Sequence, residues 1–139
     1  MSSFLYEMIH KENDARPYVR ASIFVWKKTG TENFLIDSGS SISYLSAVKS
    51  DQIKITKSQK EDVYERYIWG KSVKGFDMLC DVVFYNPHSK KEERIALQFF
   101  CVICDLHIPC ILGVNFLQKL KFIKLEWWNP SKVELHFHS

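Results

Sequence analysis

The sequence lacks a long apolar run and a large net charge, and these two absences exclude whole classes of protein. The most apolar segment, Ile95 to Val114, is interrupted by Gln98, Asp105, His107 and Pro109, so it is not a membrane-spanning stretch. The first residues, MSSFLYEMIHKEND, have neither a basic start nor an apolar stretch of signal-peptide length. A net charge of +3 over 139 residues is too small to indicate nucleic acid as the main partner. We expect a soluble, non-secreted protein that binds neither nucleic acid nor membrane.

Cysteine is also scarce, with four in the chain, mostly within apolar alternating segments. This pattern favours reduced core residues over a disulfide framework. Cys101, Cys104, His107 and Cys110 are potential zinc ligands, but their spacing is tighter than that of common zinc motifs. On a strand, Cys101 and Cys104 would also point to opposite faces. We therefore predict buried thiols, no metal site and no cofactor.

The length fits one domain that buries about two thirds of the surface of its unfolded chain. Alternating apolar and polar residues predict a mostly β fold. The predicted strands are Tyr18 to Trp26, Phe34 to Ile36, Phe76 to Tyr85, Arg94 to Cys104, Phe122 to Trp128 and Lys132 to His138. Helical spacing predicts a short helix over Val114 to Leu120, and the polar stretch Lys49 to Arg66 predicts a surface loop or short helix. We divide the chain into a linker or extension, 1–16, and a domain, 17–139.

Only five glycines occur, so we expect each one where the backbone bends or is approached closely. Gly30 is predicted to turn the first hairpin, within Lys27 to Asn33, and Gly39 to open the loop that follows Phe34 to Ile36. The other three are assigned to a second loop, which Gly70 and Gly75 bracket, and to the start of the helix, which Gly113 precedes.

One short motif carries catalytic chemistry. The apolar strand Phe34-Leu35-Ile36 leads directly into Asp37-Ser38-Gly39, so that a single carboxylate stands at the exit of a hairpin. The motif alone is weak evidence, because Asp-Ser-Gly also occurs in ordinary Asx-type surface turns. None of the other aspartates is followed by Ser/Thr-Gly: Asp14, Asp51, Asp62, Asp77, Asp81 and Asp105.

A second motif, Ile111-Leu112-Gly113 before Val114-Asn115-Phe116-Leu117, follows about seventy-five residues after Asp37. With these two motifs in this order, the chain resembles the retropepsins, the aspartic proteases of retroviruses and LTR retrotransposons, over roughly residues 17 to 135. The resemblance implies a retropepsin-like acid protease fold: a small, closed, β-barrel-like domain with one short helix in its C-terminal half, forming a homodimer. It also implies cleavage of a polyprotein, in the cytoplasm or within a virus-like particle.

Hydrolysis of a peptide by two carboxyl groups needs one ionised and one protonated member. Because this chain has one Asp-Ser-Gly, a homodimer in which Asp37 of each protomer meets on a two-fold axis follows. By the resemblance, Ser38 bonds to the partner loop and Gly39 leaves room for an amide to approach the carboxylate. Ser40 and Ser41 stand where the family binds the substrate backbone. Ile111, Leu112 and Gly113 pack under the active site, and Asn115 starts the helix.

Retropepsins close a hairpin flap over an extended peptide, and the stretch from Tyr67 to Gly75 is the candidate here, with Trp69 and Gly70 at its tip. Trp69 is equally compatible with a packed aromatic. The dimer contact is assigned either to Ser3 to Ile9 or to the last hairpin, whose Trp127, Trp128 and Phe137 offer apolar surface. We favour the hairpin.

Two other functions compete with this one. A serine or cysteine hydrolase would use one of the five histidines, but the sequence contains no nucleophile-elbow motif, and no HExxH of a zinc protease. The stronger alternative is a retrotransposon-derived dimerisation or peptide-binding module whose protease activity is weak or lost, because a fold alone does not fix function. The intact Asp37-Ser38-Gly39 favours the enzyme.

Overall fold

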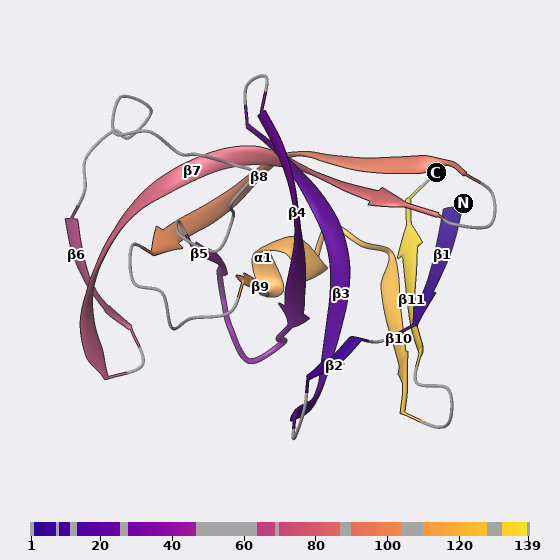
Figure 1. Cartoon of the computed structure of the whole chain (residues 1–139), viewed down its shortest axis with the longest axis horizontal. Coiled ribbons are helices and arrows are strands. Elements are labelled where there is room, and N and C mark those ends of the chain that lie inside the picture. The colour runs from indigo at the N-terminus through magenta and orange to yellow at the C-terminus, as the bar shows by residue number, and fades with distance from the viewer. Residues whose placement is uncertain are drawn as a thin grey trace.

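The computed structural model describes residues 2–7, 9–11, 14–25, 28–46, 64–68, 70–86, 90–103, 110–127 and 132–138, which are mostly β with one short helix (Figure 1). The strands are β1 (Ser2–Glu7), β2 (Ile9–Lys11), β3 (Asp14–Val25), β4 (Lys28–Ile36), β5 (Ser43–Ser46), β6 (Tyr64–Ile68), β7 (Lys71–Tyr85), β8 (Glu92–Ile103), β9 (Cys110–Leu112), β10 (Phe122–Glu126) and β11 (Lys132–Phe137). The helix is α1 (Val114–Leu117). Among the described residues, no helix is long enough to cross a membrane.

Six strands close into a barrel in the order β3, β4, β9, β5, β8 and β7, and pairing of β7 with β3 completes the ring. The β4–β9 and β5–β8 pairs are parallel, and the other pairs around the ring are antiparallel. Strands β2 and β6 extend the sheet beyond the ring, on β3 and β7 respectively. The predicted fold class, a small closed barrel with one short helix in the C-terminal half, is confirmed.

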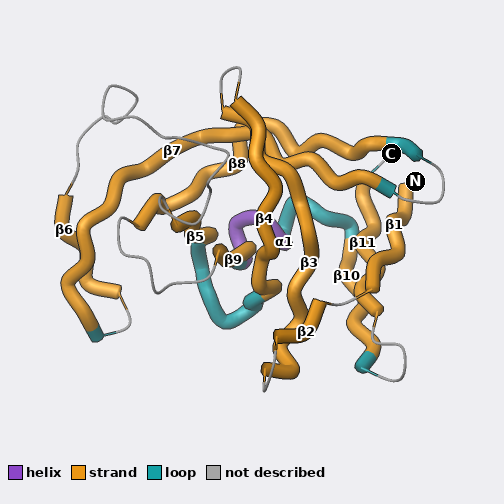
Figure 2. Tube along the Cα trace, viewed as in Figure 1, coloured by secondary structure: helices purple, strands orange, loops and turns teal. Residues whose placement is uncertain are grey.

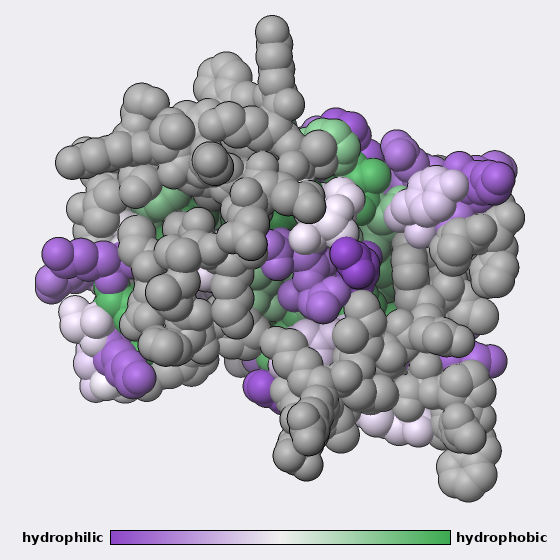
Figure 3. Space-filling model, in the orientation of Figure 1, coloured by the Kyte–Doolittle hydropathy of each residue, from purple (hydrophilic) through white to green (hydrophobic). Residues whose placement is uncertain are grey.

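Apolar side chains that point inward fill the barrel and form the main core. Phe34 lies 6.0 Å from Phe100 across the barrel, measured between ring centroids. Phe84 contacts Phe116 of α1 at 5.7 Å and Phe137 of β11 at 5.8 Å. The helix and the last hairpin therefore cover the barrel and share its core. In the view of Figure 3, the coloured residues at the outline are mostly hydrophilic, and hydrophobic residues show mainly in recesses between them.

The first hairpin is longer than predicted. Strands β3 and β4 stay paired up to Val25 opposite Lys28, so Gly30 lies within β4, opposite Ile23. The prediction of a turn over Lys27 to Asn33 was wrong because polar residues were read as a loop. Pairing with β3 holds these polar residues in a strand, and the hydroxyls of Ser22 and Thr31 meet across it at 3.1 Å.

The helix is shorter than predicted, and Phe116 is the residue that it buries. It ends at Leu117, and bonds from the Lys119 amide to the Phe116 carbonyl (2.9 Å) and from the Leu120 amide to the Leu117 carbonyl (3.1 Å) tighten the chain into turns. Phe116 and Leu120 are buried, whereas Val114 is exposed. A four-residue helix is too short for its apolar period to fix an orientation.

The N-terminal residues take part in both sheets. Strand β1 pairs with β11, from Ser2 opposite Phe137 to Glu7 opposite Lys132, and β2 pairs with β3. With β10, which lies on the other side of β11, β1 and β11 form a three-stranded sheet in the order β1, β11, β10. The division of the chain at residue 17 remains a prediction.

The last hairpin is confirmed, but its exposed surface differs from expectation. Phe137 is only 1% exposed and belongs to the main core, so it is not available for a dimer contact as predicted. It points inward because alternate residues of β11 face the barrel. Trp127 is 52% exposed, as expected of a surface contact. Trp128 lies outside the described residues.

Strand β7 runs unbroken from the β6–β7 hairpin into the barrel, so Gly75 lies inside a strand and does not bracket a loop as predicted. A Cβ atom on Gly75 would stand 2.6 Å from the carbonyl oxygen of Val102 in β8. Glycine is therefore required here because the two backbones approach closely.

We expect Gly75→Ala to lower the free energy of unfolding by roughly 1–3 kcal/mol, because the added methyl group must push two paired strands apart. Urea denaturation of the purified chain measures this change. Ser72→Ala, on an exposed site of the same strand, is the matched control and should change stability little. Equal stability of the Gly75 variant and the parent would contradict the close approach.

Candidate active site

Asp37 stands where two parallel strands end side by side. Strand β4 pairs with β9 through Leu35 opposite Ile111 and Ile36 opposite Leu112. The Asp37 amide then donates to the Leu112 carbonyl at 3.1 Å, which extends the pairing by one hydrogen bond. This bond fixes the direction in which the chain leaves β4, so the predicted position of Asp37 at a strand exit is confirmed.

The loop after β4 turns back onto the Asp37 carboxylate. The Gly39 amide donates to Asp37 Oδ1 at 2.9 Å, and the Ser40 amide donates to the Asp37 carbonyl at 3.2 Å. A Cβ atom at residue 39 would lie 3.1 Å from Oδ1, so a larger residue would crowd the carboxylate. Asp37 is half-buried, while Ser38 and Gly39 are exposed. By itself this geometry is an Asx turn, which also occurs at ordinary surface loops, so the residues that pack under the turn are what distinguish it.

That support comes from the start of α1. The Val114 amide donates to the Ser40 carbonyl at 2.8 Å, and the Asn115 amide donates to the Ser41 carbonyl at 3.2 Å. Gly113 lies directly against the loop, since a Cβ there would overlap the Ile42 carbonyl. Ile111-Leu112-Gly113 therefore does lie under the Asp37 loop, and glycine is the residue that fits.

A buried polar network, which we call the Ser43–Asn115 network, ties this loop to the barrel. Ser43, at the start of β5, is fully buried; its hydroxyl accepts from the Gly113 amide at 3.0 Å and donates to Asn115 Oδ1 at 2.6 Å. Asn115 Nδ2 donates to the Phe99 carbonyl of β8 at 3.2 Å. Asn115 thus does more than start the helix. Ser43 was missed from the sequence; its one signal is a hydroxyl within an apolar strand, which requires a partner.

The hydroxyl of Ser40 bonds to the Ile42 carbonyl at 2.7 Å, within the loop, and Ser41 is exposed. Both backbone carbonyls are engaged by α1. The substrate contacts predicted for these two serines remain a prediction.

A second apolar cluster lies beside the site, separate from the main core. It contains Leu35 and Ile111, which lie two residues before Asp37 and Gly113, and it reaches Ile68 and Val73 of the β6–β7 hairpin. Its remaining buried members are Tyr18, Tyr44, Cys101 and Ile103. The hairpin and the strand that carries Asp37 are therefore joined through one apolar cluster.

The predicted hairpin from Tyr67 to Gly75 exists, as β6 and the first part of β7. Ile68 is opposite Lys71, and Gly70, which directly precedes Lys71, has φ +76°, the left-handed conformation that favours glycine. Trp69 lies outside the described residues. In Figure 2, the start of β7, the loop after β4 and the end of β10 all lie along the lower edge of the view. The role of the hairpin as a flap remains a prediction.

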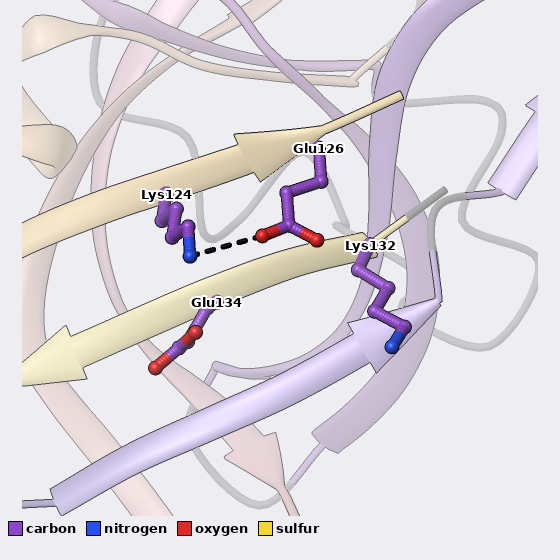
Figure 4. A pocket seen from close by; sticks show the side chains of 4 residues that line it. All are labelled: Lys124, Glu126, Lys132 and Glu134. Atoms are coloured by element: carbon purple, nitrogen blue, oxygen red, sulfur yellow. Dashed lines mark ion pairs between the residues drawn. The ribbon is translucent and has the colours of Figure 1, made fainter. Parts of the chain in front are cut away.

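A different hollow lies on the outer face of the β10–β11 hairpin, lined by Lys124, Glu126, Lys132 and Glu134 (Figure 4). Lys124 and Glu126 form an ion pair at 2.9 Å. The hydrogen bond between them raises the pKa of Lys124 and lowers that of Glu126, so each keeps the other charged. We assign no catalysis to these four groups.

The zinc ligands considered above are only partly described. Cys101 and Cys110 are buried in β8 and β9, as predicted for core thiols, whereas Cys104 and His107 lie outside the described residues. The third described thiol, Cys80, is also buried, and desolvation raises its pKa to about 12. It is therefore protonated at neutral pH and inert as a nucleophile.

No protein-family model and no curated protein matches this sequence. Solved structures do match. A retropepsin-like aspartic protease from Rickettsia conorii aligns with a TM-score of 0.64 and 16% identity, over 98% of this chain and 93% of that chain. The chain has a retropepsin-like fold. EIAV protease in complex with the inhibitor HBY-793 also aligns, with a TM-score of 0.47 and 18% identity, over 79% of this chain and 92% of that chain.

The retropepsin-like fold confirms the resemblance that Asp37-Ser38-Gly39 and Ile111-Leu112-Gly113 suggested. Along the chain, the Asp37 loop comes first, then the β6–β7 hairpin, and then the strand and helix that support the loop. Likeness in fold at this identity leaves the chemistry to be argued from the residues.

We expect Asn115→Ala to lower the free energy of unfolding by roughly 1–3 kcal/mol, because it removes the acceptor of the buried Ser43 hydroxyl. Urea denaturation measures the change, with Gln118→Ala, on the exposed end of the same helix, as control. Ser43→Ala combined with Asn115→Ala should cost less than the two single changes added together. Strict additivity would show that the two side chains are not coupled.

Proposed function

We propose that this chain is an aspartic endopeptidase that acts as a homodimer, in which the Asp37 carboxyls of two protomers activate a water molecule. The observation that supports this most is the position of Asp37: a half-buried carboxylate that receives the Gly39 amide and is held at the end of paired β4 and β9. In a retropepsin-like fold, this position suits a catalytic acid.

The need for a second chain comes from the chemistry. One carboxyl group must be ionised to draw a proton from water, and the other must be protonated to donate to the carbonyl oxygen and then to the leaving amine. Two carboxyls that share a small site divide in this way because both cannot hold a negative charge at once. Since one chain has a single Asp-Ser-Gly, the second carboxyl comes from a second copy.

The remaining groups fit this scheme. Ser38 is exposed at the turn, where its hydroxyl is accessible to the loop of the second copy. An extended peptide would lie between the Asp37 loop and the β6–β7 hairpin, pairing its backbone with the protein. Side chains beside the scissile bond would be apolar, because the second cluster is apolar next to Asp37. We further propose a polyprotein of retroviral or retrotransposon type as the biological substrate, and an intracellular site of action.

Asp37→Asn should abolish peptide cleavage, a loss of at least about 10²–10⁴-fold, because the amide cannot take a proton from water. Sedimentation equilibrium should still show a dimer, since the substitution preserves shape. Asp77→Asn, which changes an aspartate on β7 outside the loop, is the matched control and should retain activity. Undiminished turnover by Asp37→Asn would rule out this mechanism.

Specific activity should fall on dilution, because the site is complete only while two protomers are associated. A cleavable peptide, selected from a library in the presence and absence of a statine-type inhibitor, reports the activity. Sedimentation over the same concentrations reports the association. A constant specific activity down to concentrations at which only monomer is present would contradict a shared site. A chain that dimerises and binds peptides but cleaves none is instead a binding module.

A further inference from the structure

The sheet formed by β1, β11 and β10 has two open edges. Strand β11 lies in the middle, paired with β1 from Ser2 to Glu7 and with β10 from Phe122 to Glu126. Its backbone hydrogen bonds are thus used within one chain on both sides. In the described part of the chain, a strand from another molecule can therefore join this sheet only along β10 or along β1.

Of these two edges, β10 is the one coupled to the Asp37 loop. It begins at Phe122, shortly after α1, whose first residues hold the Ser40 and Ser41 carbonyls. In Figure 1, β10 lies on the barrel side of the sheet and β1 on the outer side. The proposed function requires the Asp37 loops of two copies to meet, so a contact rigidly connected to that loop is favoured over a distant one.

We infer that two copies of this chain associate by antiparallel pairing of β10 with β10 across a two-fold axis. The result is a six-stranded sheet in the order β1, β11, β10, β10, β11, β1, in which each β1 stays with its own chain. This inference rests on the proposed function, since it is the need for a second Asp37 that calls for a second copy. It also implies that the sheet of each protomer is already complete before association.

The charges on β10 select one register. If Lys124 or Glu126 lay on the axis, that residue would face its own copy, and the two like charges would repel. If Ile123 lay on the axis, Lys124 would face Phe122 of the second copy, without an ion pair. If Leu125 lies on the axis, Lys124 faces Glu126 of the second copy, twice by symmetry.

The register centred on Leu125 also continues the existing pattern of charge. Within one chain, Glu134 is opposite Lys124, and Lys132 is opposite Glu126. Across the axis, one line of facing side chains would run through Glu134 and Lys124 of the first copy and then Glu126 and Lys132 of the second copy. The sign of the charge would thus alternate over four strands. On the other face, the partly buried Leu125 would meet its own copy, and Ile123 would be opposite the exposed Trp127. Lysine and glutamate on an edge usually prevent pairing, but here they permit one register.

Charge reversal tests this contact. Lys124→Glu makes β10 carry two acids, and Glu126→Lys makes it carry two bases, so each variant alone should dimerise about 10- to 30-fold more weakly at low salt. An equimolar mixture of the two variants should recover the parental dimerisation constant. In the mixed dimer, the acidic β10 of one chain would pair with the basic β10 of the other, so opposite charges would face each other at both positions.

Sedimentation equilibrium at low salt measures these constants, and the defect should shrink at high salt. Lys132→Glu, on the central strand β11, and Glu7→Lys, on the edge strand β1, are the matched controls and should change the constant by less than about threefold. A defect in Glu7→Lys with none in Lys124→Glu would place the contact on β1 and overturn the inference. Failure of the mixture to recover, or a parental chain that remains monomeric, would also overturn it.

Peptide cleavage, measured in the same samples, separates this inference from the proposed function. If the mixture recovers the dimer and no sample cleaves any peptide, the β10 contact holds and the protease proposal fails. If the parental chain cleaves peptide in a concentration-dependent manner and both reversals dimerise normally, the protease proposal holds and the β10 contact fails.

Discussion

The parallel pairing of β4 with β9 is the constraint on which the candidate site depends. It brings the exit of β4 next to Leu112, so that Asp37 continues the ladder for one more bond. It also places Gly113 under the loop, close enough that a side chain would overlap the Ile42 carbonyl. Because these strands are far apart in sequence, the barrel must close before the carboxylate is positioned. The geometry of the candidate site therefore depends on formation of the whole barrel.

The Asp37 loop could be found from the sequence because its signal is local. An apolar strand, an acid and a glycine stand within six residues, and no distant partner is needed to recognise them. The alternating strands were found for the same reason, since a period of two is visible in a short window. The same local reasoning failed at Gly30, where polar residues were read as a turn although they continue a strand.

Features whose cause lies far along the chain were not found. Gly75 is required by the Val102 carbonyl, and Ser43 by Asn115, neither of which is a neighbour in sequence. Phe137 was expected at the surface because nothing local shows that it reaches Phe84. Likewise, the pairing of β1 with β11 joins the two ends of the chain. A sequence pattern reports which side of an element is apolar, but not what will cover it.

The ladder between β5 and β9 has one residue pair, Tyr44 opposite Ile111, whereas neighbouring ladders in the barrel have three or more. The β5–β9 boundary, which we call the seam, therefore has the fewest backbone pairs of the barrel. The Ser43–Asn115 network adds side-chain hydrogen bonds between β5 and the residues that follow β9. Local opening of the barrel should accordingly begin at this seam, at a lower free energy than global unfolding. Among the strands of the barrel, amide exchange would then be fastest in β5 and β9, and a ligand that contacts both strands would slow it.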